Sequence, residues 1–343
     1  MKALRHISLI VVTLLIMALA SCSNDDQYSS DPEANFEALW TVIDEHYCFF
    51  EARGIDWNEV GDRYRKLVKP EMTAKELFDV CAQMVCELRD GHTNLSSSFD
   101  VAYYRYWDAY PHNFDLRTVQ ENYLAFNYRQ ASGMTYGILP SNYGYIYYGD
   151  FMNAIGEGNL DWVLAELATT DGLIIDVRDN GGGLLTNVET LVRRFITERL
   201  YCGSITHKTG PGHNDMAKPY DYYFEPAAEG RQRYLKPIAI LTNRSSYSAT
   251  NNFVSIMKQL PQVRIVGDRT GGGCGLPFTN ELPNGWRIRF SSCIITDAAG
   301  QLTEFGIDPS EGCKVDITEA DVAAGRDPIL ERAQEVLTLM LTQ

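Results

Sequence analysis

The stretch from Pro237 to Asp268, PIAILTNRSSYSATNNFVSIMKQLPQVRIVGD, has the pattern of a strand, a helix and a second strand. Two short runs rich in isoleucine and valine flank the segment SATNNFVSIMKQL, whose apolar residues recur at helical spacing. Two strands that are joined by a helix of this length pair in parallel within one sheet. The stretch therefore predicts a βαβ unit and a sheet that contains parallel strands.

Three serines of this stretch, Ser245, Ser246 and Ser248, stand where the first predicted strand gives way to the helix. Ser248 falls near the N-terminus of that helix, where free main-chain N–H groups and the helix dipole stabilise a developing anion. A serine at this place is also a preferred helix cap, so a purely structural role is the alternative. A nucleophilic serine here would need a base from elsewhere, because residues 243–252 contain no histidine or lysine.

Two further segments carry residue types that are typical of catalytic sites. IDVRDNGGGLL, residues 175–185, places three glycines between a strand and a helix, where main-chain N–H groups are open to a ligand. This turn predicts either an oxyanion hole or only a tight turn, and it lacks the glycine spacing of nucleotide-binding loops. ELRDGHTNL, residues 87–95, places His92 in a turn after a helix, as a candidate general base or a structural histidine. We interpret three polar neighbours as architectural supports of the glycine turn: Asp176, Arg178 and Asn180.

The remaining segments complete an α/β pattern. Residues 35–89 repeat the helical period three times, and Thr73 with Glu76 has the spacing of a capping box. Further strands are expected at 136–151, 171–180 and 285–297, the last of them antiparallel, and further helices at 160–168, 187–196 and 327–341. Residues 203–232 are expected to form a long polar loop. The predicted fold class is α/β, with a parallel-containing β-sheet core, flanking helices and an N-terminal helical subdomain.

The N-terminus has the pattern of a secretory signal. A short basic segment precedes an apolar run of about 14 residues, which is too short to span a bilayer comfortably. The sequence LASC, residues 19–22, resembles the bacterial lipobox, which implies cleavage before Cys22 and lipidation of that cysteine. A plain signal peptide with a chance cysteine is the alternative. Residues 23–34 are polar and acidic, as suits a flexible tether.

The net charge and the cysteine content bear on whether the protein binds nucleic acids, metals or cofactors. The chain of 343 residues has a net charge of −15 and no basic tract, which argues against nucleic-acid binding. Seven of the eight cysteines follow Cys22, and their spacing matches no metal framework. We therefore expect neither a metal nor another cofactor. Some of these cysteines could pair in an oxidising envelope, but the sequence does not say which.

Six blocks, in this order, resemble the carboxyl-terminal processing (tail-specific) serine proteases: LRDGHTNL, GYIYYGDF, LIIDVRDNGGG, AILTNRSSYSATNNF, RIVGDRTGGG and EFGIDPS. They extend over about residues 36–317, nearly the whole chain after the tether. The resemblance implies a ClpP/crotonase-like protease core. It also implies that Ser248, in the pattern S-x-S-A, is the nucleophile. The implied oxyanion donors are Gly183, or alternatively Gly182, and the N–H of Ala249.

One departure from this family decides which base to expect. The better-known branch uses a lysine 25 residues after the serine, and this chain has Gly273 there. Lys258 lies ten residues into the following helix, where it is poorly placed to reach the serine. The tricorn-like branch instead uses a histidine of the D-G-H-T region and a distal glutamate. That resemblance implies His92 as base and Glu304 as the residue that orients it, with four acidic alternatives to Glu304: Asp90, Asp176, Asp268 and Asp308.

These observations give a domain plan and two competing functions. The plan is a lipoprotein signal peptide at 1–21, a flexible tether at 22–34, a helical subdomain at 35–95 and a catalytic core at 96–343. About 50 residues separate His92 from Gly144, too few for the PDZ domain that many family members carry.

The first function is a lipid-anchored serine peptidase of the bacterial cell envelope, at the outer membrane, that cleaves unstructured polypeptides or C-terminal tails. The second is an inactive lipoprotein that binds a peptide, a glycan or an apolar ligand in the same cleft. A separation of more than about 6 Å between His92 and Ser248 would favour the second. Five aromatic residues could line a substrate groove or pack internally: Tyr103, Tyr104, Tyr106, Trp107 and Tyr110.

Overall fold

The structure is a computed structural model that describes residues 29–104 and 109–342. The predicted signal peptide, the lipidation site Cys22, most of the predicted tether, and Tyr106 and Trp107 lie outside the described residues. The helix α2 (Pro32–His46) already begins inside the predicted tether, because Asp31 caps it and proline occupies its first position. No helix in the described part of the chain combines the length and apolar character that a membrane crossing requires.

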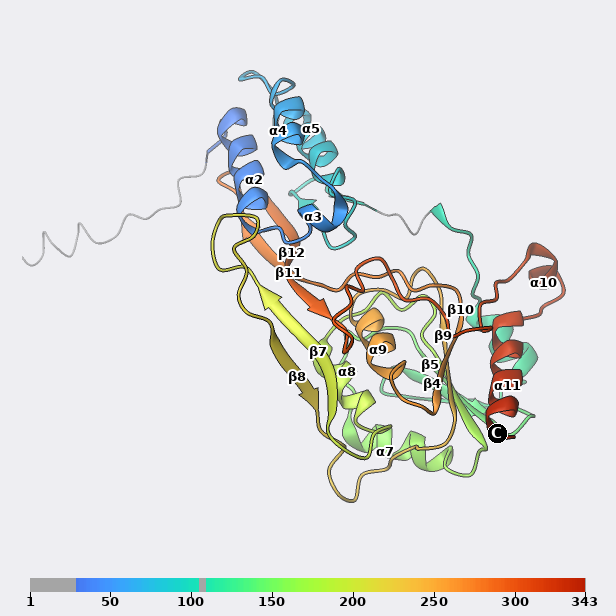
Figure 1. The fold of residues 1–343 in the computed structure, drawn as a ribbon. Helices are drawn as coiled ribbons and strands as arrows, with labels where there is room; N and C mark the ends of the chain where they lie inside the picture. Colours follow the sequence, from blue (N-terminus) through green and yellow to red (C-terminus); the bar gives the residue numbers. More distant parts are fainter. Residues whose placement is uncertain (1–28, 105–108, 343) are drawn as a thin grey trace, which may run out of the picture.

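The N-terminal helices form a separate layer at one end of the molecule (Figure 1). After α2 come α3 (Phe50–Arg53), α4 (Trp57–Arg65) and α5 (Ala74–Cys86). The predicted capping box is confirmed, since Thr73 accepts from the Glu76 N–H while the Glu76 carboxylate accepts from the Thr73 N–H. Phe36, Leu39 and Ile43 are buried on one face of α2, as the helical period predicts.

A central six-stranded sheet positions the segments that the sequence analysis singled out. Its strands are β3 (Tyr128–Ala131), β4 (Met134–Ile138), β5 (Tyr143–Tyr148), β6 (Gly172–Asp176), β9 (Ile238–Thr242) and β10 (Val263–Gly267). Their order in space is β10-β9-β6-β5-β4-β3. The four strands from β10 to β5 pair in parallel, and β4 and β3 are antiparallel additions. The βαβ unit predicted from residues 237–268 is confirmed, with α9 (Ala249–Met257) as its helix.

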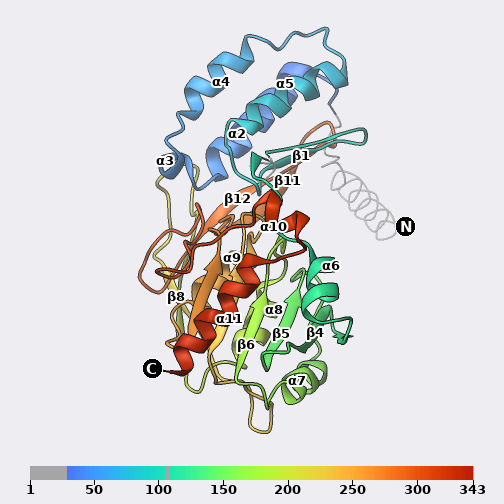
Figure 2. The ribbon, with the colours of Figure 1, turned by 90° about the vertical axis from the view of Figure 1, so that its right-hand side faces the viewer.

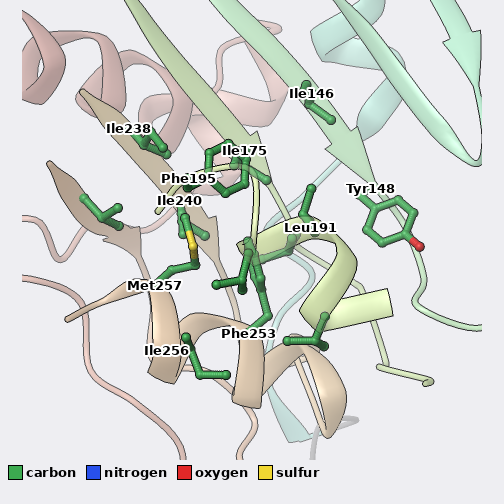
Figure 3. Packing of buried hydrophobic residues seen from close by; sticks show 14 of the residues in the cluster. Ile146, Tyr148, Ile175, Leu191, Phe195, Ile238, Ile240, Phe253, Ile256 and Met257 are labelled. Carbon is green, nitrogen blue, oxygen red and sulfur yellow. The ribbon is translucent and has the colours of Figure 1, made fainter. Parts of the chain in front are cut away.

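Both faces of this sheet are covered by helices. The helices α7 (Glu157–Glu166), α8 (Leu185–Val192) and α9 pack on one face, and α11 (Pro328–Leu341) packs on the other (Figure 2). Neighbouring residues alternate between the faces: Ile238 and Ile240 contact the first group of helices, while Ala239 and Leu241 contact α11. Figure 3 shows how Phe253 and Met257 of α9 meet Ile238 and Ile240 in this core.

A second, antiparallel sheet joins the core to the helical layer. Its strands are β1 (Asn94–Ser96), β2 (Val101–Tyr103), β7 (Leu200–His207), β8 (Tyr220–Phe224), β11 (Gly275–Glu281) and β12 (Arg287–Thr296). β12 pairs with β1, β11 and β7 and carries the buried Ile288 and Phe290 toward the helices. The expected antiparallel strand at 285–297 is therefore confirmed. The prediction of a long polar loop at 203–232 is wrong in part, because residues 203–207 belong to β7 and residues 220–224 form β8, which pairs with it.

Three short helical segments complete the described structure: α6 (Leu116–Thr118), the π-helical turn η2 (Val119–Tyr123) and α10 (Glu319–Ala323). The part of residues 93–143 that the structure describes folds into short strands, turns and the helical segments α6 and η2, and it contains no PDZ domain. The seven cysteines from Cys48 to Cys313 are free thiols.

Candidate active site

The serine turn and the glycine turn meet because their strands are neighbours. β6 and β9 pair in parallel, so their carboxyl ends lie at the same edge of the sheet. Gly181–Gly183 follow β6, and Ser248 follows β9. A Cβ atom added to Gly182 would lie 2.7 Å from the Cβ of Ser248 and 2.9 Å from the nitrogen of Ala249. The two turns are therefore in direct contact.

Ser248 sits in a strained backbone conformation immediately before α9. Its φ is +60° and its ψ is −121°, a region that non-glycine residues rarely adopt. Its side chain makes no capping hydrogen bond to the helix, so the capping interpretation does not describe it. The neighbouring Ser246 is fully buried, and its hydroxyl donates to the Val177 carbonyl at 2.8 Å. Of these two serines, only Ser248 presents its hydroxyl to a base.

His92 is the side chain that contacts the Ser248 hydroxyl. The Nε2 atom of His92 lies 2.8 Å from the Oγ atom of Ser248, although 156 residues separate them in the chain. With the imidazole proton on Nδ1, the serine hydroxyl donates to Nε2, which is the arrangement that general-base activation requires. The separation of more than about 6 Å that would favour a binding function is not present.

Hydrogen bonds to Asp90 and from β12 hold the main chain of His92 in place. Its main-chain N–H donates to Oδ1 of the buried Asp90 at 2.8 Å, and Oδ2 of Asp90 accepts from the Ser291 hydroxyl on β12. The Arg289 guanidinium donates to the His92 carbonyl at 3.3 Å. The Nδ1 atom of His92 is buried, and no side chain or main-chain group of the described residues accepts its proton.

Burial is the main influence on the pKa of His92. Removal of the ring from water lowers its pKa to about 4, with Asp90 opposing the shift and Arg289 and Arg53 adding to it. The resting imidazole is therefore neutral near neutral pH. A neutral imidazole is the form that can accept the serine proton.

The acid limb of the pH–rate profile should lie well below that of an ordinary histidine. We expect kcat/KM to fall with a midpoint near pH 4 rather than 6.5, because the base stays neutral until then. The folding linkage has the same sign: the unfolded chain protonates His92 first, so stability also falls as the pH drops from about 6.5 toward 4. Initial rates should therefore be measured at each pH, and circular dichroism at the same pH should show whether the protein is still folded. The same midpoint in Glu304→Gln would assign the limb to His92, and a midpoint near 6.5 would contradict the assignment.

Glu304 lies in a buried charged cluster beside this pair. Its Oε1 accepts from the Arg53 guanidinium at 2.5 Å, and its Oε2 accepts from the Cys274 N–H at 2.8 Å. Burial and the nearby Asp90 raise the pKa of the Glu304 carboxyl, and Arg53 opposes that shift. Neither Glu304 nor Asp90 makes a side-chain hydrogen bond to the His92 ring in the described structure. The structure thus brings His92 and Ser248 together and places Glu304 in contact with Arg53.

The predicted oxyanion donors differ in their availability. The Gly182 N–H already donates to the Asn180 side chain at 2.9 Å. Within the described residues, the N–H groups of Gly183 and Ala249 donate to no acceptor, and Ala249 itself is buried. Of the two glycines considered, the geometry favours Gly183. Gly183 also packs so tightly on the main chain of Phe151 that a Cβ would lie 2.2 Å from its carbonyl carbon.

The polar residues around the glycine turn are architectural, as predicted. The Asn180 side chain accepts from both the Gly182 N–H and the Thr250 hydroxyl, and thus links the two turns. The buried Arg178 guanidinium pairs with Asp176 at 2.6 Å and with Asp327 at 2.8 Å. This pairing ties the end of β6 to the start of α11.

The structure explains why the lysine position is a glycine. Gly273 has a φ of +80°, and a Cβ there would lie 2.4 Å from the ring of Tyr247. That ring packs against the imidazole of His92 with 4.9 Å between the centroids. A lysine at position 273 would therefore displace Tyr247.

Three further side chains that could act as a base or a nucleophile, Lys258, His213 and Cys274, are engaged elsewhere or buried. The Lys258 ammonium donates to the Asp308 carbonyl at 2.8 Å. His213 hydrogen-bonds to Asp44 and stacks on Phe50 of the helical layer. Cys274 is buried, and burial raises the pKa of its thiol. In the described part of the chain, no group of three or more histidine, cysteine, aspartate or glutamate side chains is arranged to hold a metal ion.

A cavity of about 770 Å³ opens over the candidate catalytic pair. His92, Ser248 and the three glycines line it, together with apolar Met152, Leu184 and Pro277. Its size falls in the usual range of ligand pockets. Tyr104 and Tyr110 of the predicted aromatic groove line a neighbouring cavity instead.

Comparison with known proteins agrees with this arrangement. The pattern described as Peptidase family S41 matches residues 142–311, and the pattern of the Tricorn protease C1 domain matches residues 28–86. A solved structure of a protein from Parabacteroides merdae is 50% identical, with a TM-score of 0.85 over 90% of this chain and 97% of its own. The chain belongs to peptidase family S41. Its membership supports a peptidase that acts on polypeptides.

More distant S41-type structures share the fold. Mature CPAF is 11% identical with a TM-score of 0.69 over 91% of this chain and 99% of its own, and the tricorn protease is 18% identical with a TM-score of 0.60. This chain covers 91% of its length in the tricorn comparison but only 37% of the tricorn protease. The carboxy-terminal processing protease CtpB of Bacillus subtilis is 27% identical over 191 residues. The chain spans 36% of CtpB and 18% of a Tricorn-like protease C-terminal subunit of Sulfurisphaera tokodaii.

Arg53 is the neighbour of the site that sequence reasoning missed. It comes from a four-residue helix far from the glutamate in the chain, and its segment FEAR carries no motif. Asp90 was considered only as a competitor to Glu304. Its position two residues before the histidine was the available signal, because an aspartate there can accept from the histidine main-chain N–H.

Proposed function

We propose that this S41 family member is a serine peptidase with Ser248 as nucleophile and His92 as general base. The observation that supports it most strongly is the 2.8 Å contact between His92 Nε2 and Ser248 Oγ beside two N–H groups that donate to no acceptor among the described residues. As the serine oxygen attacks the peptide carbonyl carbon, its proton passes to Nε2. The imidazolium then gives that proton to the departing amine. Water repeats the sequence on the acyl-enzyme and releases the second product.

The oxyanion of the tetrahedral intermediate is assigned to the N–H groups of Gly183 and Ala249. Both are main-chain groups on adjacent turns, so little reorganisation is needed when charge develops. Ala249 is also the first residue of α9, where the helix dipole favours a negative charge. The Asn180 side chain holds the two turns in register.

Glu304 belongs to this proposal as the carboxylate that supports His92. Asp90 and Arg53 influence the pKa values of both His92 and Glu304, so the four groups share one buried neighbourhood. When His92 becomes positively charged, carboxylates in that neighbourhood stabilise it at low local dielectric. Direct orientation of the ring would require the Glu304 side chain to leave Arg53.

We infer that the substrate is an unstructured polypeptide or a C-terminal tail. The cavity over Ser248 is bordered by the glycine turn and by β11, so a chain must lie extended to bring a carbonyl to the serine. A folded domain cannot supply such a segment without local unfolding.

Covalent labelling tests the nucleophile directly. A fluorophosphonate probe should modify the native protein at one residue, and peptide mass spectrometry should place the adduct on Ser248. Ser248→Ala should lose the label completely. Ser246→Ala is the matched control, because that hydroxyl is buried and bonded to Val177, and it should keep the label. An adduct that persists in folded Ser248→Ala, or no adduct on the folded native protein, would refute the proposal.

We also propose that the protein is held at the bacterial envelope by a lipid on Cys22. The supporting observation is the LASC pattern after a short apolar run. Cells that express the full chain with an alkyne-tagged fatty acid should yield a labelled protein in the membrane fraction. Cys22→Ala should abolish the label and move the protein to the soluble fraction. Equal labelling of the two proteins would exclude Cys22 as the anchor.

A further inference from the structure

A second cavity, of about 460 Å³, adjoins the one over the catalytic pair. Gly91 and Tyr247 line both cavities, and they are the chain neighbours of His92 and Ser248. A polypeptide whose carbonyl reaches Ser248 therefore has this second cavity within a few residues, since an extended chain advances about 3.3 Å per residue.

Four arginines line this cavity, and they come from four separate segments. They are Arg53, Arg89, Arg244 and Arg269, and among the described residues that line the cavity only Glu304 carries a carboxylate. We call this space the arginine cavity. The concentration of positive charge stands out because the whole chain has a net charge of −15. Charges of one sign in a concave site attract ligands of the opposite sign.

The four guanidinium groups differ in how far their charges are already neutralised. Arg53 pairs closely with Glu304, and Arg244 pairs with Asp268 at 2.7 Å. Arg89 donates to the Arg53 carbonyl and forms no ion pair with any carboxylate of the described residues. Arg269 lies 3.7 Å, measured from its Nε, from the exposed Asp308 carboxylate, and its guanidinium donates to the Gly306 carbonyl at 3.4 Å.

Two of the guanidinium groups that line this cavity also carry a buried donor without a hydrogen-bond partner among the described residues. The Nε atoms of Arg53 and Arg269 are buried and make no hydrogen bond within the described structure. Buried donors of charged groups are normally satisfied, because leaving one unpaired is costly. A carboxylate matches the planar fork of a guanidinium and accepts from it at two oxygens.

We propose that the arginine cavity binds a carboxylate of the polypeptide substrate and thereby selects where the chain is cut. The ligand is either the free α-carboxylate of the chain end or an acidic side chain near the scissile bond. Arg89 and Arg269 supply the charge that is not already paired, and the rings of Tyr104, Tyr110 and Phe305 provide apolar walls beside it. This inference rests on the proposed function, because it assumes that a polypeptide occupies the neighbouring cavity.

Peptide binding to Ser248→Ala tests the inference without any need for turnover. Four dansyl-labelled octapeptides of otherwise neutral sequence are compared by fluorescence anisotropy: with a free or amidated C-terminus, and with or without two glutamates. If the chain end is the ligand, the free acid should bind at least about tenfold more tightly than the amide. If a side chain is the ligand, the glutamate peptide should show that advantage instead. The preference should shrink as salt is added.

Variants of the arginine cavity make the test specific. Arg89→Gln and Arg269→Gln, each added to Ser248→Ala, should reduce the carboxylate preference by about fivefold or more and leave binding of the neutral amide unchanged. Arg63→Gln is the matched control, because Arg63 is an exposed arginine of the helical layer that lines neither cavity. Equal binding of all four peptides, no measurable binding, or a preference that survives both variants would overturn the inference.

Labelling separates this inference from the proposed function. Arg89→Gln and Arg269→Gln in the native Ser248 background should still react with the fluorophosphonate probe. If they react and no carboxylate preference exists, only the inference about the arginine cavity fails. If the preference exists and the native protein does not react, only the peptidase proposal fails.

Discussion

Replacing His92 by alanine is expected to lower kcat by about 10³–10⁵-fold, with a much smaller change in KM. The Ser248 hydroxyl would lose the acceptor that lies 2.8 Å from it, and no other base among the described residues is placed to take its proton. Loss of one member of a catalytic unit removes most of what the whole unit contributes, and the oxyanion donors account for the residual rate. Steady-state hydrolysis of a quenched fluorescent peptide measures the effect.

Two further variants make the His92 experiment decisive. Lys258→Ala should keep kcat within about twofold, because the lysine ammonium contacts the Asp308 carbonyl and not the serine. Glu304→Gln should lose roughly 10–10²-fold, less than His92→Ala, because its carboxylate acts on the imidazolium only through the buried cluster. If Lys258→Ala were inactive and His92→Ala active, the base would be misassigned. Thermal unfolding of each variant shows whether the fold is retained.

The glycine turn gives the second prediction of large effect. Gly183→Ala should lower kcat by at least about 10²–10³-fold, since a Cβ would meet the Phe151 main chain at 2.2 Å and displace an oxyanion donor. Gly182→Ala should be comparably harmful, because its Cβ would lie 2.7 Å from that of Ser248. Positive φ values of +148° and +98° add strain to both.

Gly181 provides an internal control on the same turn. A Cβ on Gly181 meets nothing within 4 Å, and its φ is not in the left-handed region. Gly181→Ala should therefore retain kcat within about threefold and should fold normally. Similar losses in all three variants would show that the turn tolerates no side chain for a reason other than the contacts with Phe151 and Ser248. Full activity of Gly183→Ala would remove that residue from the oxyanion proposal.

The central sheet could be predicted from sequence because its signals are local. Residues 237–268 alternate between strand and helix patterns, and the structure confirms β9, α9 and β10. The apolar run at residues 173–175 of β6 and the capping box at Thr73 are local signals of the same kind. The strands at 200–207 and 220–224 were missed because their residues show no regular alternation of buried and exposed positions, and they are defined by their pairing with β12 and with each other.

Only those residues of the candidate site that lie in recognisable sequence motifs could be predicted from the sequence. Ser248 and the glycine turn follow strands that the sequence identifies, so their meeting follows from the parallel pairing of β6 and β9. The resemblance to a known family pointed to His92, whereas the 2.8 Å contact required the structure. The contact between Glu304 and Arg53 joins residues 251 apart, and no periodicity or spacing foretells such a pair. The arginine cavity likewise assembles from four segments that share no sequence pattern.

The pairing of β1 with β12 has a consequence for how the protein matures. His92 precedes Ser248 by 156 residues, and Asn94 beside it pairs with Arg289. At 5–20 residues per second a ribosome needs roughly 8–30 s to pass from the histidine to the serine, and longer to reach the strand that seats the histidine. In a growing chain His92 and Ser248 are therefore not yet in contact, and we expect that unfinished molecules do not cleave one another. The order of the segments in the chain delays peptide cleavage until β12 has been made and has paired with β1.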